Sequence, residues 1–193
     1  KKSMAGKNRK TKIGFIGQGY VGKNCADDFE RRGYSVVRYA LEAPYNLNKE
    51  QVRACDIVFI AVPTPTTTKG FNNSIVKDAL RLVKKGSIAV LKSTMPPGHT
   101  AAMQKQFPNL TILFSPEFLS EKTAAHDAAH PFINVVGLGG NTTKHRVAAK
   151  KIEGLLPHAS HSRICNSIEA ECIKYAHNGS GYVQIVFFNL LYD

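Results

Sequence analysis

The chain has 193 residues, of which 43% are hydrophobic and 21% are charged. No apolar run approaches the roughly 20 residues that a membrane-spanning helix needs, so the sequence predicts a globular chain with no membrane partner. The length suits one full domain and part of a second, because domains usually contain about 100 to 200 residues. Lysine and arginine number 26 against 14 acidic residues, and the net charge of +12 favours anionic partners such as phosphorylated metabolites.

The N-terminus is strongly basic. Residues 1–12 hold six of the 26 cationic side chains and no acid. We interpret residues 1–11 as a solvated tail; an arm that binds nucleic acid or another polyanion is the alternative, and it is not the favoured one. No apolar segment of a secretory signal follows, so we expect a cytoplasmic protein.

Helical and extended patterns alternate along most of the chain. In order, the sequence predicts a strand at 12–16, a helix at 20–32 closed by Gly33, and strands at 34–39 and 56–62. It then predicts a helix at 74–83, a strand at 87–91, a helix at 100–106, strands at 111–114 and 134–136, and a helix at 142–156. This rhythm predicts an α/β fold over residues 12–165, with a Rossmann-like, doubly wound and mostly parallel sheet.

From residue 166 onward the pattern changes to one long helix. We expect Ser167 to cap it, with Glu169 and Glu171 in its first turns, where acids suit the helix dipole. The helix reaches Asp193 without a stop signal, so we expect that the parent protein continues beyond this residue. The apolar run 183–188 needs a cover, which predicts self-association through this helix.

A glycine turn follows the first predicted strand and opens the first predicted helix. Its sequence is G-x-G-x-x-G, formed by Gly17, Gln18, Gly19, Tyr20, Val21 and Gly22. In this context the glycines allow a tight turn, a close approach to a pyrophosphate, and tight packing of helix on strand. The amides at the helix start then bind the diphosphate of a dinucleotide.

The position that usually recognises the adenosine ribose lacks its acid. A carboxylate is expected at the end of the second strand, about 20 residues after the glycine turn. Ala40 stands there, and Glu42 follows two residues later. Three interpretations stay open: Glu42 acts from a displaced loop, Arg38 accepts a 2′-phosphate and shifts the preference towards NADP, or both side chains face solvent.

Four further segments carry a more specific signal. Three follow predicted strands and one lies on the long helix: Val62-Pro63-Thr64-Pro65-Thr66, Lys92-Ser93-Thr94-Met95-Pro96-Pro97-Gly98, Ser115-Pro116-Glu117-Phe118-Leu119-Ser120-Glu121, and Ile173-Lys174-Tyr175-Ala176-His177-Asn178. With the glycine turn, these strings in this order resemble the UDP-glucose/GDP-mannose 6-dehydrogenase family. The resemblance covers residues 12–193, the family's NAD-binding domain and the start of its central dimerisation helix.

The resemblance implies NAD-dependent, two-step oxidation of the C6 alcohol of a nucleotide sugar such as UDP-glucose, through a cysteine-linked thiohemiacetal and thioester. It also implies a homodimer formed through the helix at 167–193. The implied cofactor-binding residues are Gly17, Gln18, Gly19, Tyr20, Val21, Gly22, Val62, Pro63, Thr64, Ser93, Thr94 and Glu121. The implied substrate-binding residues are Glu117, Phe118, Leu119, Lys174 and Asn178.

The resemblance also implies catalytic roles for four residues. Thr94 would position the catalytic water, and Glu117 would do acid-base work in thioester hydrolysis. Lys174 and Asn178 are four residues apart, so they share one helix face and can jointly reach an oxyanion.

The chain departs from the family pattern in three places. Residues 41–55 replace a usually longer insertion between the second and third strands, and the acid at position 40 is absent. The family's catalytic cysteine lies in a G-G-x-C-F-P-K-D segment that does not occur before Asp193. We expect small buried thiols at all four cysteines: Cys25 inside a helix, Cys55 before a strand, Cys165 in a connector and Cys172 at a core position. The chain as given is therefore expected to be inactive in the full four-electron reaction.

Two other functions stay open. A noncatalytic relative could act as a binding or scaffold protein through its basic arm, and a hydroxyacid or 6-phosphogluconate type of dehydrogenase could share the glycine turn. No metal is expected, because the histidines and cysteines show no ligand spacing.

Overall fold

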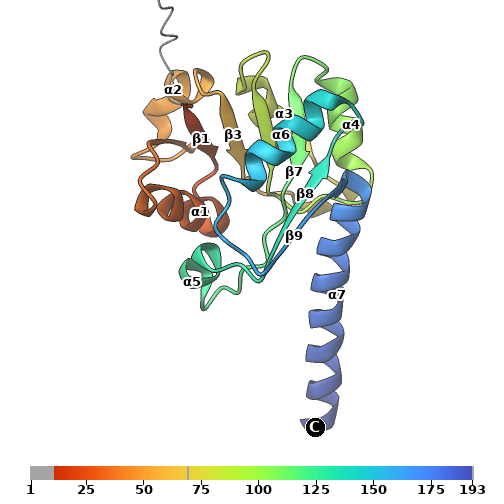
Figure 1. The fold of residues 1–193 in the computed structure, drawn as a ribbon. Coiled ribbons are helices and arrows are strands. Elements are labelled where there is room, and N and C mark those ends of the chain that lie inside the picture. The colour runs from red at the N-terminus through yellow and green to blue at the C-terminus, as the bar shows by residue number, and fades with distance from the viewer. Residues whose placement is uncertain (1–10, 69, 193) are drawn as a thin grey trace, which may run out of the picture.

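One seven-stranded sheet organises the molecule (Figure 1). The computed structural model describes residues 11–68 and 70–192, and the prediction of a solvated basic tail falls mainly outside them. The strand order is β2-β1-β3-β6-β7-β8-β9. The bounds are β1 (Ile13–Ile16), β2 (Val36–Tyr39), β3 (Ile57–Ile60), β6 (Ile88–Leu91), β7 (Thr111–Phe114), β8 (Ile133–Leu138) and β9 (His161–Asn166). All neighbours are parallel except β7 and β8, which confirms the doubly wound, mostly parallel prediction.

Helices cover both faces of this sheet. One face carries α1 (Tyr20–Arg31) and α6 (Thr143–Glu153), which pack on Phe15, Phe59 and Leu113. The other carries α2 (Lys49–Arg53), α3 (Ser74–Leu82), α4 (His99–Gln106) and the start of α7 (Ser167–Tyr192). Strands β1, β3 and β7 are buried along their whole length, which explains their mostly apolar sequences.

Several short elements escaped the sequence prediction. They are η1 (Asn46–Asn48), α2, the hairpin of β4 (Thr66–Thr67) with β5 (Gly70–Phe71), α5 (Ala124–Ala129) and β9. Strand β9 lies at the edge of the sheet, where His161, Ser162 and Arg163 are exposed and give no apolar run. The prediction that Cys165 lies in a connector was therefore wrong, because this residue belongs to β9 and is buried.

The long helix α7 is anchored at its start and projects away from the sheet (Figure 1). Its buried residues are Ser167, Ala170, Glu171 and Lys174, and everything from Tyr175 to Tyr192 is exposed. The side chain of Asn166, not that of Ser167 as predicted, accepts a hydrogen bond from the first turn, at 2.9 Å from the Glu169 amide. Cys172 is exposed, contrary to the prediction, because it lies off the buried stripe. Within the described ranges, no helix is long and apolar enough to cross a membrane.

A buried histidine joins α6 to α4 and β7. In His145, Nε2 lies 2.8 Å from Gln104 Oε1 and Nδ1 lies 2.8 Å from Thr142 Oγ1. The same Gln104 oxygen accepts a hydrogen bond from the Ile112 amide at 2.7 Å. Burial, with a smaller effect of the Lys144 charge, lowers the pKa of His145 below its usual value.

This lowered pKa predicts a stability loss in mild acid. Below about pH 6.5 the imidazole binds a proton in the unfolded state but stays neutral in the folded state. The free energy of unfolding therefore falls as the pH is lowered, until the pKa of the folded state is reached. Above that window both states are neutral and the effect disappears. Urea unfolding between pH 5 and 8 should show this slope, and His145→Gln should flatten it whereas His158→Gln, at an exposed position, should not. An unchanged slope in H145Q would contradict the prediction.

Candidate dinucleotide and substrate site

The glycine turn between β1 and α1 is formed by close backbone contacts. Gly17 has φ +89°, and its amide donates to the Tyr39 carbonyl at 2.9 Å. A Cβ at Gly17 would lie 2.2 Å from the Ala61 carbonyl oxygen, and one at Gly22 would lie 2.0 Å from the Gly17 oxygen. Side chains are therefore excluded at both positions. The helix consequently starts directly above the ends of β1 and β3.

The start of α1 is suited to an anion. Gly19 is its N-cap residue and provides no side-chain acceptor, and the first turn contains no acid. The helix therefore presents amides and the positive end of its dipole without a capping group from its own N-cap. Nothing lies within 4 Å of the Cβ position at Gly19, so a ligand can approach the backbone there. These residues fit the pyrophosphate of a dinucleotide.

Tyr20 connects this turn to the loop that follows β7. Its hydroxyl donates to the Leu119 carbonyl at 2.7 Å. Burial, with the charges of Glu117, Glu121 and Asp127, raises the pKa of Tyr20 to about 12. Beside it, the side-chain Nε2 of Gln18 donates to the Gly17 carbonyl at 3.0 Å, and Val21 is half-buried. The six predicted turn residues thus lie together at the carboxyl edge of β1.

In β2, at the end of the site where the sequence analysis expected adenosine, Arg38 is not a free cation. It is buried, and its Nη2 lies 2.7 Å from Asp27 Oδ1 and 2.6 Å from Glu30 Oε2. The interpretation that Arg38 faces solvent was wrong, because its charge is paired with two carboxylates of α1. This pairing also leaves Arg38 poorly suited to a 2′-phosphate. Glu42 is exposed.

The loops after β3 and β6 are hydrogen-bonded to each other. Ser93 Oγ accepts from the Val62 amide at 2.9 Å and donates to the Val62 carbonyl at 2.6 Å. Thr64 Oγ1 donates to the Thr94 carbonyl at 3.0 Å. The predicted cofactor residues Val62, Pro63, Thr64, Ser93 and Thr94 therefore form one continuous rim beside the glycine turn.

A buried ion pair joins α7 to the loop after β7 at the same edge of the sheet. Lys174 Nζ lies 3.0 Å from Glu117 Oε1 and 2.6 Å from the Glu117 carbonyl oxygen. The two side chains are 5% and 12% exposed. Glu117 Oε2 accepts from the Leu119 amide at 2.7 Å, and the Lys174 ammonium lies 5.4 Å from the centre of the Phe118 ring. Lysine and glutamate are thus held together although 57 residues separate them.

Two predicted residues lie outside this cluster. Asn178 and Glu121 are both exposed, and within the described chain neither forms a hydrogen bond with the ion pair. Asn178 follows Lys174 by one helical turn on α7, where the helix has already left the sheet. The structure therefore brings together Glu117, Phe118, Leu119 and Lys174. It leaves Asn178 and Glu121 exposed outside this cluster.

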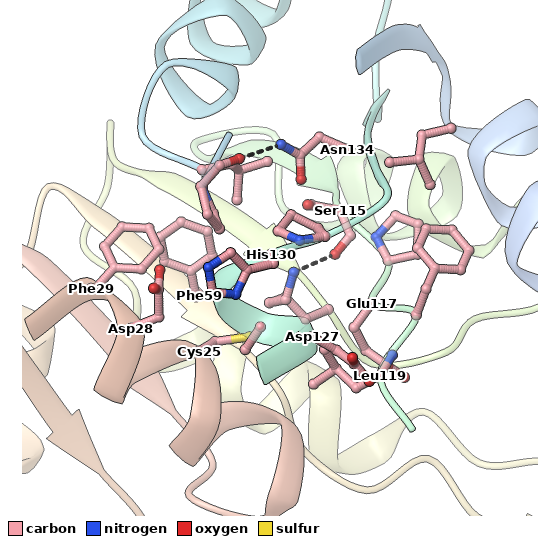
Figure 2. A pocket seen from close by; sticks show the side chains of 18 of the residues that line it. Cys25, Asp28, Phe29, Phe59, Ser115, Glu117, Leu119, Asp127, His130 and Asn134 are labelled. Atoms are coloured by element: carbon pink, nitrogen blue, oxygen red, sulfur yellow. Dashed lines mark hydrogen bonds between the residues drawn. The ribbon is translucent and has the colours of Figure 1, made fainter. Parts of the chain in front are cut away.

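A cavity of about 230 Å³ borders the same loop from the α1 side (Figure 2). Its wall is mostly apolar, with Phe29, Phe59 and Phe132 among its lining residues. Lys92 also lines it; this side chain is buried, and its ammonium donates to the Ser115 carbonyl at 3.0 Å. Its burial could not be predicted from the sequence, because Lys92 is an isolated cation after an apolar strand.

All four thiols are free. Burial raises the pKa of Cys25 and Cys165, and raises that of Cys55 to about 11. Among the residues that the structure describes, no three or more His, Cys, Asp or Glu side chains are grouped to hold a metal ion.

One residue of the site was misinterpreted from the sequence. Glu171 was expected to interact favourably with the dipole of its own helix. It is instead fully buried and accepts hydrogen bonds from the start of α4. The signal was its spacing: Glu171 is three residues before Lys174 and four after Ser167, so all three lie on one helix face. Without the position of α4, that spacing does not reveal the partner.

The fold and this edge define a dinucleotide-binding domain of the NAD-dependent dehydrogenase class. Residues 38–153 match the NAD binding domain of the UDP-glucose/GDP-mannose dehydrogenase family. The chain belongs to this family, and its cofactor is NAD.

Individual relatives agree with this assignment, and a solved structure shares the fold. The chain is 27% identical over 222 residues to UDP-glucose 6-dehydrogenase of Rickettsia prowazekii (strain Madrid E), covering 94% of this chain and 51% of the relative. It is 32% identical over 150 residues to UDP-glucose 6-dehydrogenase TuaD of Bacillus subtilis (strain 168), covering 72% and 32%. GDP-mannose dehydrogenase from Pseudomonas aeruginosa shares the fold, with a TM-score of 0.74, 21% identity, and 93% of this chain and 52% of that chain covered. The chain thus spans between about a third and about half of the length of these relatives.

The buried ion pair predicts a large stability effect. Lys174→Met should lower the free energy of unfolding by roughly 3 kcal/mol, because it leaves the Glu117 carboxylate buried without its cation. The exposed pair of Lys150 with Glu153 offers a matched control, and Lys150→Met should cost less than about 1 kcal/mol. Urea unfolding of both variants checks this. Equal losses would mean that the Lys174 pair is effectively solvated.

Proposed function

We propose that this chain supplies the NAD-binding part of an enzyme that oxidises the C6 alcohol of a nucleotide sugar, of the UDP-glucose class, to the carboxylate. The observation that carries the proposal is the shared edge of the sheet, where the glycine turn, the Ser93–Thr94 loop and the Lys174–Glu117 pair lie in sequence. The names of the relatives support the substrate class. Bound NAD supplies the acceptor for the hydride.

The residues of this chain would bind the cofactor, orient the reacting water and exchange protons with it. The backbone amides that follow Gly17, from Gln18 to Gly22, hold the pyrophosphate, and the rim formed by Val62, Thr64 and Ser93 positions the nicotinamide half. Lys174 is the cation placed to stabilise negative charge on the substrate oxygen, with Asn178 as a neutral donor one turn away. Thr94 orients water, and Glu117 exchanges protons with it when substrate displaces part of its pairing with Lys174.

A nucleophilic thiol for the second oxidation is not provided by the described cysteines. Burial keeps Cys25, Cys55 and Cys165 in the thiol form by raising their pKa values, and a thiol is a poor nucleophile. Cys172 is two residues before Lys174, so it points to another face of α7. We propose that this cysteine comes from outside the 193 residues.

Cofactor binding tests the proposal. Gly19→Ala should leave the fold intact, because the Cβ position is open, but should weaken NADH binding at least about tenfold by occupying the approach to the pyrophosphate. NADH fluorescence measures the affinity, and the melting temperature controls for folding. Gly181→Ala, at an exposed position on α7, should leave the NADH affinity unchanged. Wild-type protein that binds no NADH at millimolar concentration would sink the proposed function.

We also propose that α7 makes a homodimer. Its exposed second half presents a large apolar surface, with Val183, Val186, Phe187, Leu190 and Leu191 each 40% exposed or more. Phe187→Asp should shift the protein to monomer in analytical ultracentrifugation, since a charge in an apolar interface is costly. Asn189→Asp introduces the same charge on the same helix at a polar position and should have little effect. A wild-type monomer at the highest attainable concentration would refute this part of the proposal.

A further inference from the structure

The start of α4 lacks a cap of its own. This helix begins at His99, directly after the loop that carries Ser93 and Thr94, and its N-cap residue is Gly98. Gly98 has φ +90° and no side chain, so it cannot accept a hydrogen bond from the first turn. Backbone amides at a buried helix start need acceptors, because an unsatisfied donor is costly away from water.

The acceptor comes from α7. Glu171 Oε2 accepts from the Gly98 amide at 2.6 Å, and Glu171 Oε1 accepts from the Thr100 amide at 2.7 Å. The Glu171 side chain has no solvent exposure, and in the described chain it forms no ion pair. Its negative charge is therefore balanced by the two amides and the positive end of the α4 dipole.

The same face of α7 also holds the other loop of the site. Lys174 lies three residues after Glu171, and its ammonium binds Glu117 in the loop after β7. Glu171 binds the end of the loop after β6. Two adjacent charged side chains of one rigid helix thus fix the two loops that carry Thr94 and Glu117.

We infer that Glu171 is a positioning residue that fixes the Ser93–Thr94 loop relative to Lys174. Through this loop, Glu171 positions the nicotinamide end of the cofactor. This inference rests on the proposed function, in which that loop flanks the nicotinamide half. Glu171 itself is buried behind the loop and acts through the Gly98 and Thr100 amides. The glycine turn is held by β1, α1 and β3, so the ADP half of the cofactor does not depend on Glu171.

This separation of the two halves gives a selective test. In the 193-residue chain, Glu171→Ala should weaken NADH binding about tenfold, the factor for one lost buried acceptor, while ADP-ribose binding changes less than about twofold. Glu171→Gln keeps the shape and one acceptor oxygen, so its loss should be smaller and equally selective. Glu169→Ala is the matched control, because Glu169 lies on the same turn of α7 but pairs with Arg163 near the surface. It should change neither affinity.

Amide hydrogen exchange gives a second readout that needs no ligand. E171A should speed exchange at residues 98–101 selectively, whereas a general loss of stability would speed it throughout the core. If E171A does not fold, E171Q carries both measurements. Unchanged NADH affinity, equal weakening of NADH and ADP-ribose, or uniform exchange overturns the inference. A wild-type chain that binds neither ligand overturns the proposed function instead, and the exchange pattern still decides whether Glu171 orders this loop.

Discussion

The site depends on two buried charges at the start of α7. Charged groups are stable inside a protein only when their partners meet them with good geometry, so Glu171 and Lys174 restrict how α7 can sit on the sheet. Glu171 requires the amides of α4, and Lys174 requires Glu117 and its carbonyl oxygen. Satisfying both at once places the loops after β6 and β7 against one face of the helix.

The opposite end of the site is built from backbone alone. At Gly17 and Gly22 the chain passes so close to its neighbours that no side chain fits, and the start of α1 is left with free amides. Backbone groups bind a diphosphate without discriminating between nucleotides. Selectivity must then come from side chains around the turn, and Arg38 is already held by Asp27 and Glu30. This arrangement agrees with the NAD cofactor of the family.

The exposed part of α7 gives the molecule a distinct second region. Beyond Lys174, the His177 ring still lies against Phe118 and Phe132, but the described residues 175–192 are all exposed and many of them are apolar. Exposing an apolar surface of this kind to water is unfavourable in free energy, and association that buries the surface removes this penalty. The helix therefore links a rigid anchor at the site to the surface through which we propose that the chain dimerises.

Local sequence determined the sheet, the glycine turn and the long helix. Apolar runs such as 56–62 require burial on both faces, and the glycine spacing requires a tight turn, so neither depends on distant residues. The order of the motifs also placed Thr94 and Glu117 at one edge of the sheet, because parallel strands end together, whereas it placed Lys174 only on the long helix. Their roles came from the family resemblance.

Tertiary structure alone decided the partners. Strand β9 has polar, exposed residues and forms only because β8 offers an edge. The burial of Arg38, the pairing of Lys174 with Glu117 and the capping of α4 by Glu171 join segments up to 73 residues apart. Periodicity predicts which face of an element is buried, but it does not predict which polar group of a neighbouring element contacts that face. The sequence therefore identified the charged residues of the site, and the packing of α7 assigned their contacts.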